Sequence, residues 1–296
     1  MRRFRVLLAA VVLAGVLIAP ACADDRIKVV TTFTILADFA RNVGGDRVDV
    51  ATLVGPDADA HVYTPSPADA KTIAAAKLMI INGLGLEGWL PRLLKSSGGT
   101  ARMVVASDKI VPLKASNDHH GEADPHAWQS VANAKIYVEN IRDALTAIDP
   151  AGSSGYMANA SAYLAKLDVL DRDVRAAVAQ IPPARRKVIS THTAFGYFAA
   201  AYGVTFLAPQ GVSTDSEPSA RDIARIIRQI RQEKIPAVFL ENISDPRLVE
   251  RIATETGATI GGTLYSDSLT GEKGDAPTYI DMVRHNIKAL MGALAR

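Results

Sequence analysis

The feature that most constrains the fold is a pattern of short apolar runs and helix-like segments that occurs twice in the chain. Residues 28–34 (KVVTTFT) are echoed by residues 187–193 (KVISTHT), an offset of 159 positions (187 − 28 = 159). The Ser-Asp pair at 107–108 recurs at 266–267 with the same offset. Because these matches keep a common order, they predict two lobes of one topology.

Within each half, apolar and β-branched runs alternate with segments whose apolar residues have helical spacing. In the first half, Ser66 and Pro67 are suited to the N-cap and first position of a helix. Alternation of this kind predicts an α/β fold in which each lobe is a mostly parallel sheet covered by helices. The predicted strands are 27–32, 48–54, 78–81, 103–106, 187–190, 237–240 and 259–265.

A long helix is predicted between the two halves. Residues 156–180 contain no Gly or Pro, and Leu164, Leu167, Leu170 and Val174 recur at steps of three and four. Such a helix would be about 40 Å long, enough to connect one lobe to the other. The predicted division is an N-terminal lobe at 24–150, a connecting helix at 151–181 and a C-terminal lobe at 182–296.

The N-terminus has the pattern of a signal peptide, predicted at 1–23. Three arginines precede an apolar run at 7–18, and Ala21-Cys22-Ala23 supplies a small-x-small cleavage site. The run is shorter than the roughly 20 residues of a membrane span. We therefore expect export to the periplasm, with a membrane anchor or lipidation of Cys22 as alternatives. Lipidation is disfavoured because residues 19–21 lack the usual Leu three positions before the cysteine.

Charge gives no indication of a nucleic-acid partner. The formal charge of +2 includes the three leader arginines, so the mature chain carries 2 − 3 = −1. A near-neutral protein lacks the basic surface that binds phosphate backbones.

Four residues with side chains that bind metals follow predicted strands or lie in turn-rich loops: His61, His126, His192 and Asp267. Ligands of parallel sheets bind at the carboxyl ends of strands. Three imidazoles and one carboxylate suit zinc. The intervals of 65, 66 and 75 residues match no local zinc motif, and a single loop histidine is more often solvated than a ligand.

Several segments together resemble the substrate-binding proteins of zinc and manganese ABC transporters. The resemblance runs from Ile27 to the C-terminus and is carried by residues 59–67, 82–89, 124–128, 191–198 and 265–269. It implies two α/β lobes joined by a rigid helix, with one metal ion in the cleft between them. It also implies a membrane permease as partner, and we expect a monomer.

Carried over residue by residue, the resemblance makes His61 and His126 the ligands of the N-terminal lobe. His192 and Asp267 become those of the C-terminal lobe. Members associated with manganese often have Glu where this chain has His192, so the histidine favours zinc, with manganese as the alternative. An enzyme is not expected, because a zinc hydrolase keeps one coordination position open for water.

Three further residues are secondary candidates. Many zinc-type members have a long His-rich loop before the second ligand, whereas this chain has only His119 and His120 there. They could capture metal transiently, or the segment could be a solvated turn. Glu241 follows a predicted strand and could orient a ligand imidazole, as carboxylates behind metal-binding histidines commonly do.

Overall fold

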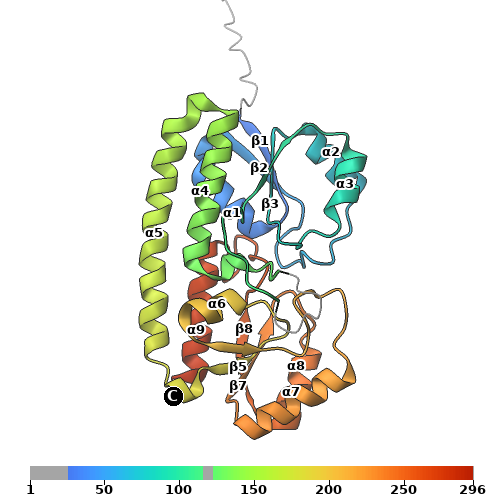
Figure 1. Cartoon of the computed structure of the whole chain (residues 1–296), viewed down its shortest axis with the longest axis vertical. Coiled ribbons are helices and arrows are strands. Elements are labelled where there is room, and N and C mark those ends of the chain that lie inside the picture. Colours follow the sequence, from blue (N-terminus) through green and yellow to red (C-terminus); the bar gives the residue numbers. More distant parts are fainter. Residues whose placement is uncertain (1–25, 116–122, 296) are drawn as a thin grey trace, which may run out of the picture.

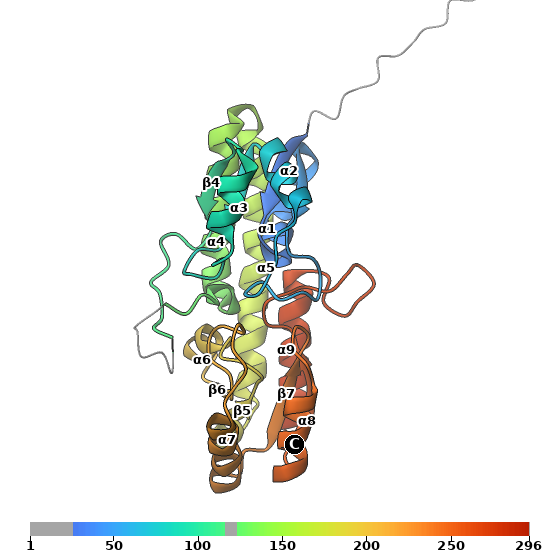
Figure 2. The same cartoon turned by 90° about the vertical axis from the view of Figure 1, so that its right-hand side faces the viewer.

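The structure is a computed structural model that describes residues 26–115 and 123–295. The predicted signal peptide at 1–23, including Cys22, lies outside the described residues, as do His119 and His120. Within the described parts, two α/β lobes are stacked end to end, with long helices along one side (Figures 1 and 2).

The N-terminal lobe contains a four-stranded parallel sheet with the order β2-β1-β3-β4. The side chains of each strand alternate between its two faces. Val29 and Ile80 contribute to the core shared with α1, α4 and α5, while Val30 and Met79 pack with α2 and α3. The elements are β1 (Ile27–Thr31), α1 (Thr34–Gly44), β2 (Val48–Thr52), α2 (Pro67–Ala75), β3 (Leu78–Ile81), α3 (Leu90–Ser97), β4 (Arg102–Val105) and α4 (Val131–Ile148).

The C-terminal lobe repeats this arrangement with the order β6-β5-β7-β8, again parallel. Strands β5 to β8 therefore occupy the positions that β1 to β4 occupy in the first sheet. The two lobes share one topology, as the repeated sequence pattern predicted. The elements are β5 (Lys187–Ile189), α6 (Gly196–Tyr202), β6 (Thr205–Leu207), α7 (Ala220–Glu233), β7 (Ala237–Glu241), α8 (Arg247–Thr256), β8 (Thr259–Leu264) and α9 (Tyr279–Leu294).

Helix α5 (Ser153–Ala179) connects the lobes and is 27 residues long. It packs on α4, α1 and α9, and in Figure 1 it runs alongside both lobes. The predicted fold class, two sheet-and-helix lobes with a long connecting helix, is confirmed. Short 3₁₀ turns complete the elements: η1 (Gly45–Arg47), η2 (Ala127–Gln129), η3 (Pro150–Gly152) and η4 (Pro183–Arg185).

One hydrophobic core passes through both lobes. It includes Val29 of the first sheet, Val188 and Phe239 of the second, and buried residues of α4, α5 and α9. The start of the last helix contacts the first lobe: the Tyr279 backbone N–H donates to the buried Asp38 carboxylate of α1, and the Tyr279 ring packs on Phe39. The lobes are therefore joined by packing as well as by the chain.

The helix starts follow local chemistry. At α2, Ser66 and Asp69 form a reciprocal capping box with Pro67 at the first position, a combination that satisfies two otherwise unpaired N–H groups.

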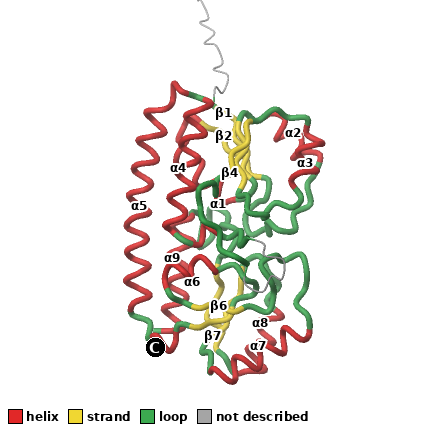
Figure 3. Tube along the Cα trace, in the orientation of Figure 1, coloured by secondary structure: helices red, strands yellow, loops and turns green. Residues whose placement is uncertain are grey.

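Among the described residues, no helix has the length and apolarity needed to cross a membrane. Loops fill the region between the two sheets (Figure 3), and the candidate site lies there.

Candidate metal centre

His61 lies in the loop between β2 and α2. Its backbone N–H donates to the Asp59 carboxylate at 2.8 Å. The Trp89 indole N–H donates to the Ala60 carbonyl at 2.8 Å. These two contacts fix the loop next to His61. Among the described residues, no carboxylate contacts the Nδ1 of the His61 ring.

His126 stands at the start of η2 and is completely buried. The Asp124 Oδ1 accepts from the His126 backbone N–H at 3.0 Å and lies 2.8 Å from its Nδ1. When the ring is neutral, Nδ1 donates its proton to Asp124 and Nε2 carries the lone pair that a metal binds. The local sequence therefore sets both the position and the tautomer of this imidazole.

His192 follows β5, and Glu241 ends the neighbouring strand β7. The Glu241 Oε1 accepts from the backbone N–H groups of Thr191 and His192, at 2.7 and 3.0 Å. Its Oε2 lies 2.6 Å from the His192 Nδ1. Glu241 thus lies directly behind the ring of His192, in an ion-pair contact without hydrogen-bond alignment, and both side chains are fully buried.

Asp267 follows β8 but is held by the N-terminal half of the chain. The carbonyl of the preceding residue, Ser266, accepts from the Trp128 indole at 2.9 Å and the Gln129 amide at 2.7 Å. Two residues later, the Leu269 N–H donates to the Thr34 hydroxyl at 2.8 Å. The carboxylate is thus placed by contacts from the opposite lobe.

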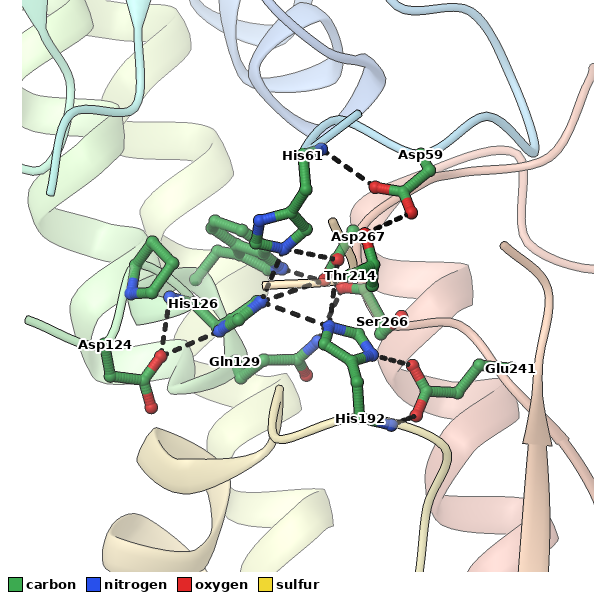
Figure 4. A network of polar contacts seen from close by, with 12 residues as sticks. Asp59, His61, Asp124, His126, Gln129, His192, Thr214, Glu241, Ser266 and Asp267 are labelled. Carbon is green, nitrogen blue, oxygen red and sulfur yellow. Dashed lines mark hydrogen bonds and ion pairs between the residues drawn. The ribbon is translucent and has the colours of Figure 1, made fainter. Parts of the chain in front are cut away.

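The four side chains converge on one point (Figure 4). The His126 Nε2 lies 3.2 Å from the Nε2 of His61 and 3.3 Å from that of His192. The Asp267 carboxylate lies 3.3 Å from the His61 Nε2, 3.6 Å from the His126 Nε2 and 3.2 Å from the His192 Nε2. All four candidate ligand atoms fall within 4.8 Å of one another.

The electrostatics of the site favour a bound cation. Burial by itself would lower the pKa of His126, but Asp267 and Asp124 outweigh it and raise the pKa to about 9. Burial would likewise lower the pKa of His192, yet the charges of Glu241 and Asp267 hold it well above its usual range. Burial would raise the pKa of Asp267, but His126 and His192 hold it well below its usual range.

The donor set fits a tetrahedral ion. Ligand bonds of about 2.0–2.1 Å in a tetrahedron place ligand atoms about 3.3–3.4 Å apart. Five of the six pairs of candidate ligands approach to 3.2–3.6 Å, counting either carboxylate oxygen of Asp267, and all four ligands lie within 4.8 Å of one another. Neither Asp267 oxygen has a well-aligned hydrogen-bond donor among the described residues. Buried carboxylates without such donors are costly unless a cation compensates them.

The structure therefore brings together the four residues predicted from the sequence, with Glu241 behind one of them. Asp124 was missed as a functional residue, although the segment that contains it was noted. The signal for it was available: an Asp stands two positions before both N-terminal histidines, at 59 and at 124. The spacing is the same in both cases, so it could not show that Asp124 contacts the ring of its histidine while Asp59 contacts only the backbone N–H of His61.

Known proteins share this architecture. A family profile described as zinc-uptake complex component A, periplasmic, matches residues 29–293. The iron-binding protein YfeA of Yersinia pestis is 37% identical over 92% of this chain and 87% of its own length. The manganese-binding lipoprotein MntA of Halalkalibacterium halodurans is 33% identical over 92% of this chain and 90% of its own length.

A solved structure agrees at the level of the whole fold. The periplasmic zinc binding protein TroA from Treponema pallidum is 33% identical, superposes with a TM-score of 0.87, and covers 92% of this chain and 100% of its own. The profile and the relatives cover nearly all of the described residues. The chain therefore belongs to the zinc-uptake complex component A family, the metal-binding substrate-binding proteins of ABC transporters.

Proposed function

We propose that the chain captures one zinc ion outside the cytoplasm and delivers it to the permease of an ABC uptake transporter. Its ligands would be His61, His126, His192 and Asp267. The observation that carries the proposal is the convergence of these four ligand atoms within 4.8 Å at a buried point. A site that removes the ion from water with four protein donors suits capture and transport.

Zinc is favoured over manganese because three of the four donors are imidazole nitrogens, which are softer than the oxygen donors that manganese prefers. Manganese is the second candidate, because one relative is named for it and another for iron. The decisive measurement is metal analysis after the denatured protein is refolded with equimolar zinc and manganese. Recovery of zinc at about one ion per chain supports the proposal, and recovery of manganese instead replaces zinc by the second candidate.

A transport role is favoured over hydrolysis by the number of donors. Catalytic zinc usually has three protein ligands and an open position for water. Four donors that face one point leave no such position on a tetrahedral ion. Incubating the zinc-loaded protein with ester and peptide substrates tests this, because turnover would contradict a purely transporting role.

We also propose that the mature protein is a periplasmic monomer released by cleavage after Ala23. The lipoprotein MntA supports lipidation of Cys22 as the alternative route to the same compartment. Intact-mass measurement of the exported protein distinguishes the two, because a lipidated chain starts at Cys22 and carries the mass of its acyl groups.

The ligand assignment is tested most directly at His126. His126→Ala removes one donor from a buried site, and we expect zinc affinity to fall at least a thousandfold, about 4 kcal/mol. The matched control is His285→Ala. The His285 ring, on α9, contacts the Thr263 carbonyl of β8 and is not one of the four clustered candidate ligands. Titration calorimetry showing unchanged affinity for the His126 variant would mean that the site is misassigned.

A further inference from the structure

The Asp59 carboxylate makes two contacts that join the lobes beside the candidate metal centre. Its Oδ1 accepts from the His61 backbone N–H at 2.8 Å. Its Oδ2 accepts from the Thr214 hydroxyl at 2.5 Å. Thr214 belongs to the loop between β6 and α7, so one carboxylate connects a candidate ligand's backbone to the opposite lobe (Figure 4).

The same loop of the N-terminal lobe has two more contacts across the interface. The Asn242 amide donates to the Asp57 carboxylate at 2.9 Å, and the Asp57 N–H donates to the Leu269 carbonyl at 3.0 Å. The loop that carries His61 is therefore held in place partly by residues that follow β6, β7 and β8 of the other lobe.

His61 depends on this loop more than the other histidines depend on theirs. The rings of His126 and His192 are oriented by Asp124 and Glu241. His61 is held through its backbone only, and its side chain is 4% exposed while the other three candidate ligands are at 0%. It is thus the candidate ligand best placed to leave the ion first.

A cavity of about 490 Å³ adjoins the Asp59–Thr214 contact. Both residues line it, together with Thr191, which precedes His192. Arg247 and Arg251 line it as well. The hydrogen bond between Asp59 and Thr214 therefore lies in the wall of this cavity, and the same Asp59 carboxylate holds the backbone of His61.

We propose that the Asp59–Thr214 hydrogen bond is a latch that keeps His61 on the bound ion, with Asp59 as a positioning residue that sets the rate of metal release. The inference rests on the proposed function, since it presupposes a bound metal. Breaking the latch frees the loop to move His61 away, whereas capture by the other three donors is unaffected. The latch should therefore slow dissociation without changing association.

The test compares Thr214→Val, which removes the hydroxyl at nearly constant volume, with Thr214→Ser, which keeps it. Zinc dissociation is measured by stopped flow with an excess of chelator, and association by mixing the metal-free protein with zinc. We expect dissociation to be about tenfold faster in Thr214→Val, equivalent to about 1.4 kcal/mol, with association within about twofold of wild type. Thr214→Ser should behave as wild type.

The matched control is Thr254→Val, which removes a threonine hydroxyl bonded only within α8 and should leave both rates unchanged. Unchanged dissociation in Thr214→Val, or an equal increase in Thr214→Ser, would overturn the latch. Hydrogen exchange of the metal-free protein gives a second readout: Thr214→Val should speed exchange in residues 56–64, and unchanged exchange there would also overturn it. Absence of zinc binding by the wild type would instead refute the proposed function, so the two failures are distinguishable.

Discussion

Glu241→Gln is the substitution that most directly tests how the protein prepares an imidazole for metal. The Glu241 Oε1 accepts from two backbone N–H groups, and its Oε2 lies 2.6 Å from the His192 Nδ1. Glutamine keeps one oxygen for the backbone donors, which places its NH₂ group against Nδ1. Because an amide NH₂ can only donate, Nδ1 must supply a lone pair and the ring proton moves to Nε2, the atom that faces the metal.

The expected loss follows from this change of tautomer. Removing a partner behind a metal-binding histidine typically costs 10- to 100-fold in affinity, which corresponds to about 1.4–2.7 kcal/mol. The burial of both side chains places the effect toward the upper end, because no water can take over the contact. The assay is competition for zinc between the protein and a chelator of known affinity, at one pH and ionic strength.

Glu87→Gln is the matched control. Glu87 is also buried, and its carboxylate accepts from the Thr32 hydroxyl and the backbone N–H groups of Asn82 and Gly83, with no histidine among these partners. This variant should lose stability and keep its zinc affinity. Equal losses of affinity in both variants, or none in the Glu241 variant, would refute the idea that Glu241 sets the tautomer of His192.

Three further predictions concern metal choice, the segment outside the described residues, and pH. His192→Glu should raise the ratio of manganese to zinc affinity by roughly tenfold, since a hard oxygen replaces a nitrogen; competition titrations with both metals measure it. Deleting 116–122, which contains His119 and His120, should leave equilibrium zinc affinity unchanged, and calorimetry showing a large loss would make one of them a ligand. Because metal must displace a proton from His126, whose pKa is raised to about 9, zinc affinity should fall as pH is lowered from 9. Because the pKa of His126 is higher in the folded state, protonation of this ring stabilises the metal-free fold below about pH 6.5, and this stabilisation is lost as pH rises through 9. The gain in melting temperature on adding zinc should therefore grow between these two pH values.

Local patterns were sufficient to predict most of the fold. The apolar run at 78–81 coincides with β3, and the uninterrupted helical pattern near 155–180 corresponds to α5. Ser66 and Pro67 marked the start of α2 because capping depends on neighbouring residues only. Short elements were missed: β6 has three residues, and α3 has eight residues and no side-chain cap, although Pro91 lies in its first turn.

The site required information that local patterns do not contain. Periodicity gives no information about His126, because it lies in the irregular connection between β4 and α4. Only the fold shows that this connection brings His126 next to His61 and His192. Contacts such as that between Trp128 and the Ser266 carbonyl join residues 138 positions apart. The family resemblance supplied the four candidate ligands because it compares whole chains, but the role of Asp124 and the contact between Asp59 and Thr214 depend on side-chain geometry.

The contact between the start of α9 and the first lobe has a consequence for the order of folding. Tyr279 completes the packing around Phe39 and donates its hydroxyl to the Trp128 carbonyl at 2.6 Å, although it lies near the end of the chain. Domains generally fold as they emerge from the ribosome, the N-terminal one first. Here the contacts of Tyr279 with Asp38, Phe39 and Trp128 form only after the last helix has been made, so the first lobe lacks them while it emerges.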